Sequence, residues 1–418
     1  MLKGYQAIGS PFLLGETMLK NWYEKFSAQP HQPFFANGIV LFIAFMILLL
    51  LSYSNKIDLN TTFMTFHAYA FVFILFIQFF LGFLFVVFPR FLIQANIEPK
   101  VYMKQFLFYF FGSYIFLIAL LCSSSLYILG LILVFVGQIL SFKTLFAIYK
   151  NSIVKDKYDT KWVLIGFGTG IVANAIFLVS LFGFEQTLFL QQFSIHSGFY
   201  LFLFIIIFAI SQRMIPFFTS LKVAGYNINK SKYLMEKVYG LLFLKLIVVT
   251  IGEPKLYILA DIPLFLFFTY ELYKWKLPLF KTTAIMWVLF ISLYWIPFGF
   301  LISSVESLSA IFNWGIIFER TSLHTLALGY FLTVLIGFGT RVVLGHSGQT
   351  PHADKVAIAM FIFIQFIVLV RLWAGLALNF EADYTFWINH SALLLIIALI
   401  AWSIKYLGIL IKGFIPNH

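Results

Sequence analysis

Apolar runs long enough to cross a lipid bilayer dominate this sequence. A membrane-spanning helix needs about 20 predominantly apolar residues, and twelve stretches approach or exceed that length. Charged residues make up 11% of the chain, well below the level typical of soluble globular proteins. Lipid must therefore surround most of the chain, and the predicted fold class is an all-α integral membrane protein. The twelve predicted transmembrane helices occupy residues 37–53, 66–88, 104–121, 124–149, 160–182, 192–212, 234–251, 255–273, 277–301, 321–345, 355–378 and 385–411.

These helices predict a single membrane domain over residues 37–411, with an amino-terminal segment (1–36) before it and a short tail (412–418) after it. The amino-terminal segment mixes aromatic residues such as Trp22 and Tyr23 with lysines, which suits a segment lying on the membrane surface. It lacks the pattern of a cleavable signal peptide. The single cysteine, Cys122, excludes an intrachain disulfide and any multi-cysteine metal site.

Lysine and arginine are distributed very unevenly between the two sets of loops. The amino-terminal segment, the loops after helices 2, 4, 6, 8 and 10, and the tail hold 23 of them, whereas the loops after the odd-numbered helices hold 4. Positive charge marks the cytoplasmic side of a membrane protein. We therefore expect both termini in the cytoplasm. Most of the lysines and arginines behind the net charge of +12 lie in these cytoplasmic loops. The expected partner is therefore the lipid bilayer, and no nucleic-acid partner is expected.

With this orientation, four even-numbered helices carry a histidine in their first turns at the outer face: His67, His196, His324 and His390. The first three are 129 and 128 residues apart. This spacing predicts three pseudo-repeated units of four helices. Neutral imidazole has one donor and one acceptor that lipid cannot satisfy. Each histidine alone is compatible with a hydrogen bond to a neighbouring helix, but four at one depth favour a shared ligand.

Haem fits these four histidines best, because imidazoles can bind the iron of a flat, apolar porphyrin between helices. We expect a b-type haem, and copper is the second candidate because imidazole also suits that metal. A fifth candidate ligand, His346, lies 22 residues after His324, which is roughly 33 Å along a helix. If His346 binds a metal, it does so at a separate site near the inner face, together with His31 or His352; the alternative is a plain interfacial turn.

Three of the five arginines end the helices that carry the first three histidines: Arg90, Arg213 and Arg341. We expect them to anchor these helix ends at the cytoplasmic head groups. The alternative is that they pair with a haem propionate or a quinone oxygen.

Several motifs resemble those of the NnrS family of bacterial membrane proteins. The run TRVVLGHSGQ (340–349), which follows LHTLALG (323–329), is similar to the TR-x3-GH-[ST]-GR run that closes a histidine-headed helix in that family. HQPFF (31–35), GFLFVVFPRF (82–91) and QRMIPFFTS (212–220) resemble its FRPFF, GFLLTAVPNW and GRVIPMFT stretches. The matches follow one order along about four-fifths of the chain.

The resemblance implies a haem- and copper-containing protein of the bacterial inner membrane that helps cells tolerate nitric oxide. It implies a fold similar to the haem–copper oxidase catalytic subunit, with family histidines at His67, His324 and His346. The chain departs from the family where WHAHEM becomes FHAYAF (66–71), so that Tyr69 and Ala70 replace a histidine and a glutamate. It also ends the closing motif in Gln349 instead of arginine. These departures favour a divergent member with a reduced metal complement.

The expected function is therefore a haem protein of the response to nitrosative stress that binds or handles nitric oxide. The redox partner and catalytic turnover are left open. Two other functions remain compatible with the sequence. A polytopic transporter can be built from repeated helical bundles, although few charges are buried here. A membrane sensor or scaffold would use the histidines only structurally.

Overall fold

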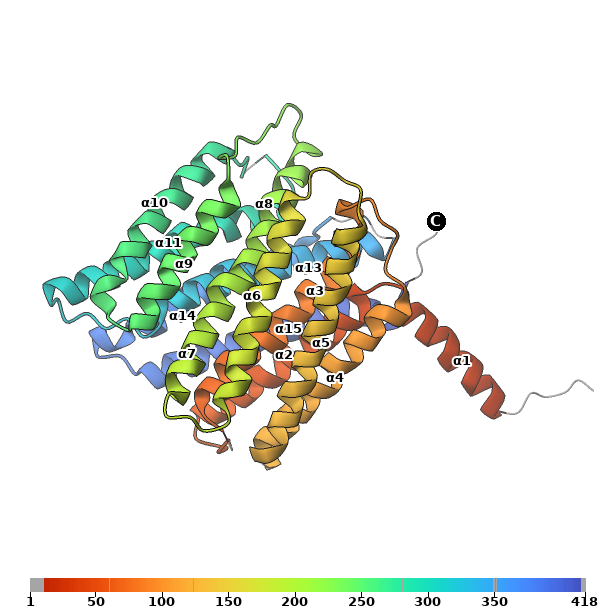
Figure 1. Cartoon of the computed structure of the whole chain (residues 1–418), viewed down its shortest axis with the longest axis horizontal. Coiled ribbons are helices and arrows are strands. Elements are labelled where there is room, and N and C mark those ends of the chain that lie inside the picture. The colour runs from red at the N-terminus through yellow and green to blue at the C-terminus, as the bar shows by residue number, and fades with distance from the viewer. Residues whose placement is uncertain are drawn as a thin grey trace, which may run out of the picture.

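The computed structural model describes residues 11–59, 61–122, 124–279, 281–348, 350 and 352–414, and every regular element in this part of the chain is a helix (Figure 1). The elements are α1 (Pro11–Phe26), α2 (His31–Tyr53), η1 (Met64–Leu75), α3 (Phe76–Phe91), α4 (Pro99–Cys122), α5 (Ser124–Asn151), α6 (Tyr158–Ser180), α7 (Thr187–Ser197), η2 (Gly198–Leu203), α8 (Phe204–Ser220), α9 (Leu234–Ile251), η3 (Pro254–Leu256), α10 (Ile258–Trp275), α11 (Ala284–Phe312), α12 (Thr321–His324), η4 (Thr325–Leu332), α13 (Thr333–His346), α14 (Lys355–Leu376), η5 (Ala377–Phe380) and α15 (Tyr384–Lys412). The predicted all-α membrane architecture is confirmed.

Eleven helical segments within the described residues are long and apolar enough to span a membrane. The helix α9, expected as the seventh span, is not among them, since it carries Glu236, Lys237 and Lys245. Lys245 is nevertheless buried, and its ammonium lies 2.8 Å from the Asp261 carboxylate and 3.1 Å from the Ser303 hydroxyl. This pairing allows a charged side chain to lie inside the bundle.

Three spans form the centre of the bundle: η1–α3, α7–η2–α8 and α12–η4–α13. Their membrane-spanning windows are 94%, 89% and 89% buried, compared with 67% or less in the other spans. The remaining helices surround them, with α9, α10 and α11 on one side and α4 and α5 on the other (Figure 1). The central spans are the ones that carry the first three outer histidines, so these residues lie inside the bundle and not on its lipid-facing surface.

Each central span contains a π-helical segment close to its histidine. His67 lies inside η1, His196 lies two residues before η2, and His324 lies directly before η4. The π-helix is rare in proteins and is frequent at functional sites, because its wider turn changes the direction of side chains. A π-helical segment therefore contains or closely follows the histidine in each of the three helices whose histidines are evenly spaced in sequence.

The outer helices differ from the prediction mainly at their ends. Helix α2 begins at His31, six residues before the expected start at residue 37, so the end of the expected surface segment is buried in the bundle. Helices α4 and α5 follow each other closely and pack backbone against backbone. A Cβ added at Gly112 would lie 2.8 Å from the Gly130 carbonyl oxygen, and one at Gly130 would lie 2.7 Å from that of Gly112. Only glycine permits this approach.

Helix α1 projects from the bundle (Figure 1). Met18, Leu19, Trp22 and Tyr23 are exposed on it, which is the composition expected of a helix that lies on a membrane surface. The Trp22 indole donates a hydrogen bond to the Ile411 carbonyl oxygen, 2.9 Å away at the end of α15. The two ends of the described chain therefore meet at one end of the bundle. We call this the inner end, and we call the end that carries His67 and His324 the outer end.

Candidate functional site

The structure brings two of the predicted histidines together at the outer end. The rings of His67 on η1 and His324 on α12 are nearly parallel, with an angle of 16° between their planes and centroids 6.2 Å apart. Phe63 and Phe71 flank the His67 ring at 4.9 and 4.7 Å. The Nδ1 atom of His67 is buried and has no hydrogen-bond partner among the described residues. A buried imidazole nitrogen without a hydrogen-bond partner is unsatisfied, and it is suited to bind a ligand.

The hydrogen bonds of His324 show that its ring is neutral. Its Nδ1 lies 2.9 Å from the Arg320 carbonyl oxygen and 3.1 Å from Nη2 of Arg371, and its Nε2 lies 3.5 Å from the same Nη2. A guanidinium can only donate, so one ring nitrogen accepts from Arg371. A neutral imidazole is the form that binds metals, and His324 would exchange this hydrogen bond for a bond to a metal.

Arg371 on α14 is the functional candidate that the sequence prediction missed. Its side chain is 6% exposed, and Nη1 is buried without a partner among the described residues. The four ion pairs within the described ranges do not include it. When lysines and arginines were assigned to loops from the sequence, Arg371 was counted with the outer loop that follows the predicted helix 355–378. Its position inside the apolar run 355–378 was the signal that could have identified it, because an arginine inside a span marks a functional site.

The other two outer histidines do not join this pair. His196 on α7 has a buried, unpartnered Nδ1, and its ring lies 6.5 Å from that of Tyr200. His390 on α15 is exposed and binds within its own helix, with Nδ1 2.7 Å from the Phe386 carbonyl oxygen. The expected set of four outer histidines is thus divided into one pair and two separate residues.

A second histidine pair lies at the inner end. The rings of His31 on α2 and His346 on α13 have centroids 5.0 Å apart. Nδ1 of His346 lies 2.7 Å from Oε1 of Gln29, and an amide oxygen can only accept, so His346 carries its proton on Nδ1 and leaves Nε2 free. Nδ1 of His31 is buried without a partner in the described chain. Of the two neighbours expected for His346, the structure therefore selects His31 and not His352.

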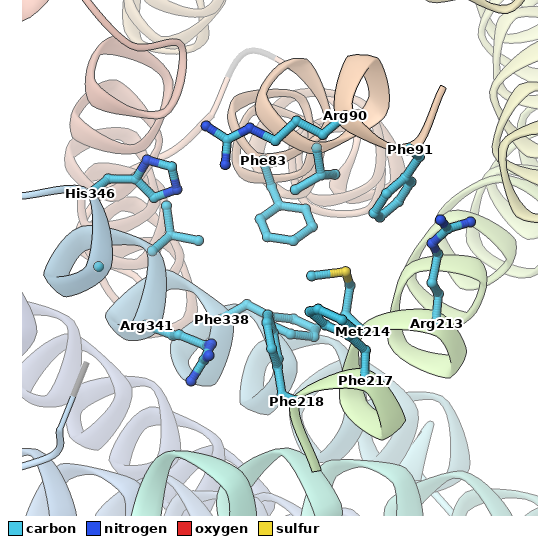
Figure 2. A pocket seen from close by; sticks show the side chains of 13 residues that line it. Phe83, Arg90, Phe91, Arg213, Met214, Phe217, Phe218, Phe338, Arg341 and His346 are labelled. Carbon is cyan, nitrogen blue, oxygen red and sulfur yellow. The ribbon is translucent and has the colours of Figure 1, made fainter. Parts of the chain in front are cut away.

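Beside His346, the inner ends of the central helices enclose a cavity of about 510 Å³ (Figure 2). Arg90 from α3, Arg213 from α8 and Arg341 from α13 all line it, together with phenylalanine rings. The sequence predicts that these arginines anchor helix ends at the head groups. The structure adds that all three line one cavity. The sequence placed the three arginines at the ends of three related helices. Only the packing of those helices shows that the arginines line a common cavity.

The arginine environments differ around this cavity. The Arg213 guanidinium lies 4.0 Å from the Phe91 ring centre and 2.8 Å from the Asp159 carboxylate. The Arg341 guanidinium lies 3.7 Å from the Phe218 ring centre. Such stacking on an aromatic face holds a cation in place. The described residues provide an acidic partner for Arg213, but none within 4 Å of Arg90 or Arg341.

Each histidine pair supplies two nitrogen donors to a metal. At the outer end these donors are on rings whose centroids lie 6.2 Å apart. The described residues contain no group of three or more histidine, cysteine or acidic side chains that could hold a metal ion. The donor sets therefore fit a metal that two imidazoles suffice to hold, such as haem iron or copper.

The fold and these sites define a polytopic helical membrane protein with paired histidines at both ends of its central helices. A sequence profile described as "NnrS protein" matches residues 25–413, which is nearly the whole chain. The chain therefore belongs to the NnrS family, and the resemblance seen in its motifs is confirmed. No curated protein matches the sequence. Gln349, the departure in the closing motif, lies outside the described residues.

Proposed function

We propose that this protein acts in the bacterial nitric-oxide response and binds nitric oxide at a haem held by His67 and His324. Membership of the NnrS family suggests the biological role. The observation that supports the cofactor is the contact between two histidine rings that are 257 residues apart in sequence, 6.2 Å apart in space and nearly parallel. Bound haem iron would supply the affinity for the gas.

The residues around the pair fit a haem in two further respects. The buried, unpartnered Nη1 of Arg371 lies beside His324 and can donate to a carboxylate. A haem carries propionate carboxylates, and a charge-assisted hydrogen bond would offset the cost of burying the arginine. The phenylalanines beside His67 provide apolar walls. We assign His67 and His324 to the iron and Arg371 to a propionate.

The remaining predicted ligands have lesser roles in this proposal. The Nδ1 of His196 is unsatisfied but lies outside the pair. The exposed His390 has its hydrogen bond within α15. A copper ion would fit the His31–His346 pair better, because the two rings lie 5.0 Å apart and the buried Nδ1 of His31 has no partner among the described residues.

The proposal includes a specific membrane arrangement. We infer that α9 is a twelfth span, since its buried Lys245 is neutralised by Asp261 inside the bundle. We also infer three repeated units, supported by the π-helical segment that follows or contains each of His67, His196 and His324. The loop charges favour an inner membrane location with both termini in the cytoplasm.

The test is the optical spectrum of the full-length protein purified from haem-replete cells. A Soret band that shifts when nitric oxide is added is expected for the wild type. The double variant His67→Ala/His324→Ala should lose that band, whereas His390→Ala, at the same end of the bundle, should keep it. A colourless wild-type protein of normal size-exclusion profile would refute the proposal.

A further inference from the structure

The proposed function leaves the inner cavity unexplained. It has no contact with the outer histidine pair and lies at the opposite end of α13, where Arg341 and His346 line it. Its walls come from the inner ends of the three central spans, and it is partly open, since Arg90, Phe217 and Gly345 on its rim are exposed. A molecule could enter it from the aqueous phase at the inner end.

The charges of the cavity favour an anion. Asp159 neutralises Arg213 and also accepts a hydrogen bond from the side chain of Gln212, which holds this ion pair at the edge of the cavity. Arg90 and Arg341 have no acidic partner among the described residues. Figure 2 shows the Arg90 guanidinium directed toward His346. Two uncompensated guanidinium groups match one phosphate monoester, which carries roughly −1.5 to −2 at neutral pH, or two carboxylates.

The walls of the cavity favour a flat, apolar body attached to that anion. Phe83 and Phe338 contact each other with ring centroids 5.5 Å apart, and Phe218 lies 6.4 Å from Phe338. A free phosphate would contact none of this apolar wall, whereas a planar ring system would bury it. A volume of about 510 Å³ also matches the pockets that enclose organic ligands of drug size.

We propose that the inner cavity binds a water-borne amphipathic anion that joins a planar aromatic body to one phosphate monoester. Arg90 and Arg341 bind the anionic groups, and the rings of Phe83, Phe218 and Phe338 contact the planar body. This site is independent of the haem assigned to the outer end.

Flavin mononucleotide is a suitable probe, because it joins a planar ring system to a phosphate monoester. Riboflavin lacks the phosphate, and inorganic phosphate lacks the ring. The full-length protein in phosphatidylcholine nanodiscs should bind flavin mononucleotide at least tenfold more tightly than either, as measured by quenching of flavin fluorescence and by calorimetry. Equal binding of riboflavin, or of inorganic phosphate, would overturn the proposal.

The arginines are tested with matched variants at the inner end. Arg341→Gln should weaken binding of flavin mononucleotide at least tenfold, while Arg341→Lys should weaken it less. Lys100→Gln removes an exposed positive charge at the same end without altering the cavity, and should change binding less than twofold. Equal losses in Arg341→Gln and Lys100→Gln would show that only the general positive field matters, which would contradict the proposal.

Two further results would assign the cavity to other occupants. If nanodiscs containing phosphatidylglycerol abolish binding of the probe, an anionic lipid occupies the site. If Arg341→Gln loses the Soret band while His67→Ala/His324→Ala keeps it, the haem lies in the inner cavity. Either result overturns this proposal, and only the second also overturns the outer haem site, so the two failures can be distinguished.

Discussion

The two ends of α12–η4–α13 carry different chemistry on one continuous span. At the outer end, His324 meets His67 and a buried arginine, Arg371. At the inner end, His346 meets His31 beside an open cavity lined by three arginines. Paired imidazole nitrogens suit a metal, whereas guanidinium groups beside aromatic rings suit an organic anion. One helix thus separates two chemically different sites by its length.

The largest expected effect tests whether the haem belongs to the outer pair. Replacing both His67 and His324 with alanine should reduce the haem content per protein more than about tenfold, since the loss of a supporting residue alone costs 10–100-fold at metal sites. Replacing both His31 and His346 should leave the haem content within about twofold, because that pair lies at the other end. The pyridine haemochrome assay measures both, and a reversed result would exchange the roles of the two ends.

Arg371 provides a sharper test of the outer end. Arg371→Gln removes a donor to the proposed propionate, and a hydrogen bond to a charged group contributes about 1.5–3 kcal/mol. Haem affinity should therefore fall roughly tenfold or more, as measured by transfer of haem to apomyoglobin. Arg320→Gln alters an exposed arginine at the same end and serves as the control. Equal haem transfer from both variants would remove Arg371 from the site.

Gln29 tests whether the inner end is a separate structural unit. Its side chain accepts from Nδ1 of His346 and donates to the carbonyl oxygens of His346, at 3.2 Å, and Phe414, at 3.0 Å. Gln29→Ala should destabilise the protein by about 1–3 kcal/mol, because these partly buried groups lose their partner. A thermal shift assay should show a lower melting temperature with an unchanged Soret band.

The control for Gln29 is Gln94→Ala, since within the described residues the side chain of Gln94 donates only to the neighbouring Ile93 carbonyl oxygen, at 3.5 Å. It should leave the melting temperature unchanged. A Soret band altered by Gln29→Ala would show that the two ends are coupled through α13.

The smallest expected effect concerns Asp354, just before α14. Its carboxylate accepts hydrogen bonds from the Lys405 ammonium and from the Ala357 backbone N–H, and these bonds lower the pKa of Asp354 below its ordinary value. The stabilisation is present above the unfolded pKa of about 3.9 and is lost as the pH falls through the lower, folded pKa.

Asp354→Asn should therefore lower the melting temperature slightly at pH 7, and this difference should shrink as the pH falls through the lowered pKa of Asp354 and the wild-type carboxylate becomes protonated. Thermal scans across this range measure the effect. A difference that grows in acid would show that the residue acts by another mechanism, and a change in the haem spectrum would extend its influence to the cofactor.

The sequence by itself determined the class of fold and the chemical candidates. Low charge and twelve apolar runs required helices in lipid, because only segments with internal hydrogen bonds can cross a membrane. The spacing of His67, His196 and His324 identified the three spans that prove to be central, and the motifs identified the family. These features are local or periodic, so they can be read along the chain.

Tertiary structure decided which candidates meet. Spacing along the sequence placed His67, His196, His324 and His390 at one depth, but depth does not determine the direction of a side chain around the helix axis. The π-helical segments change that direction, and packing brings only two of the four together. The role of Arg371 could not be predicted from the sequence for a related reason, because the burial of its side chain depends on the neighbouring helices. The inner cavity depends on three helix ends that are far apart in sequence, so only the folded bundle could show it.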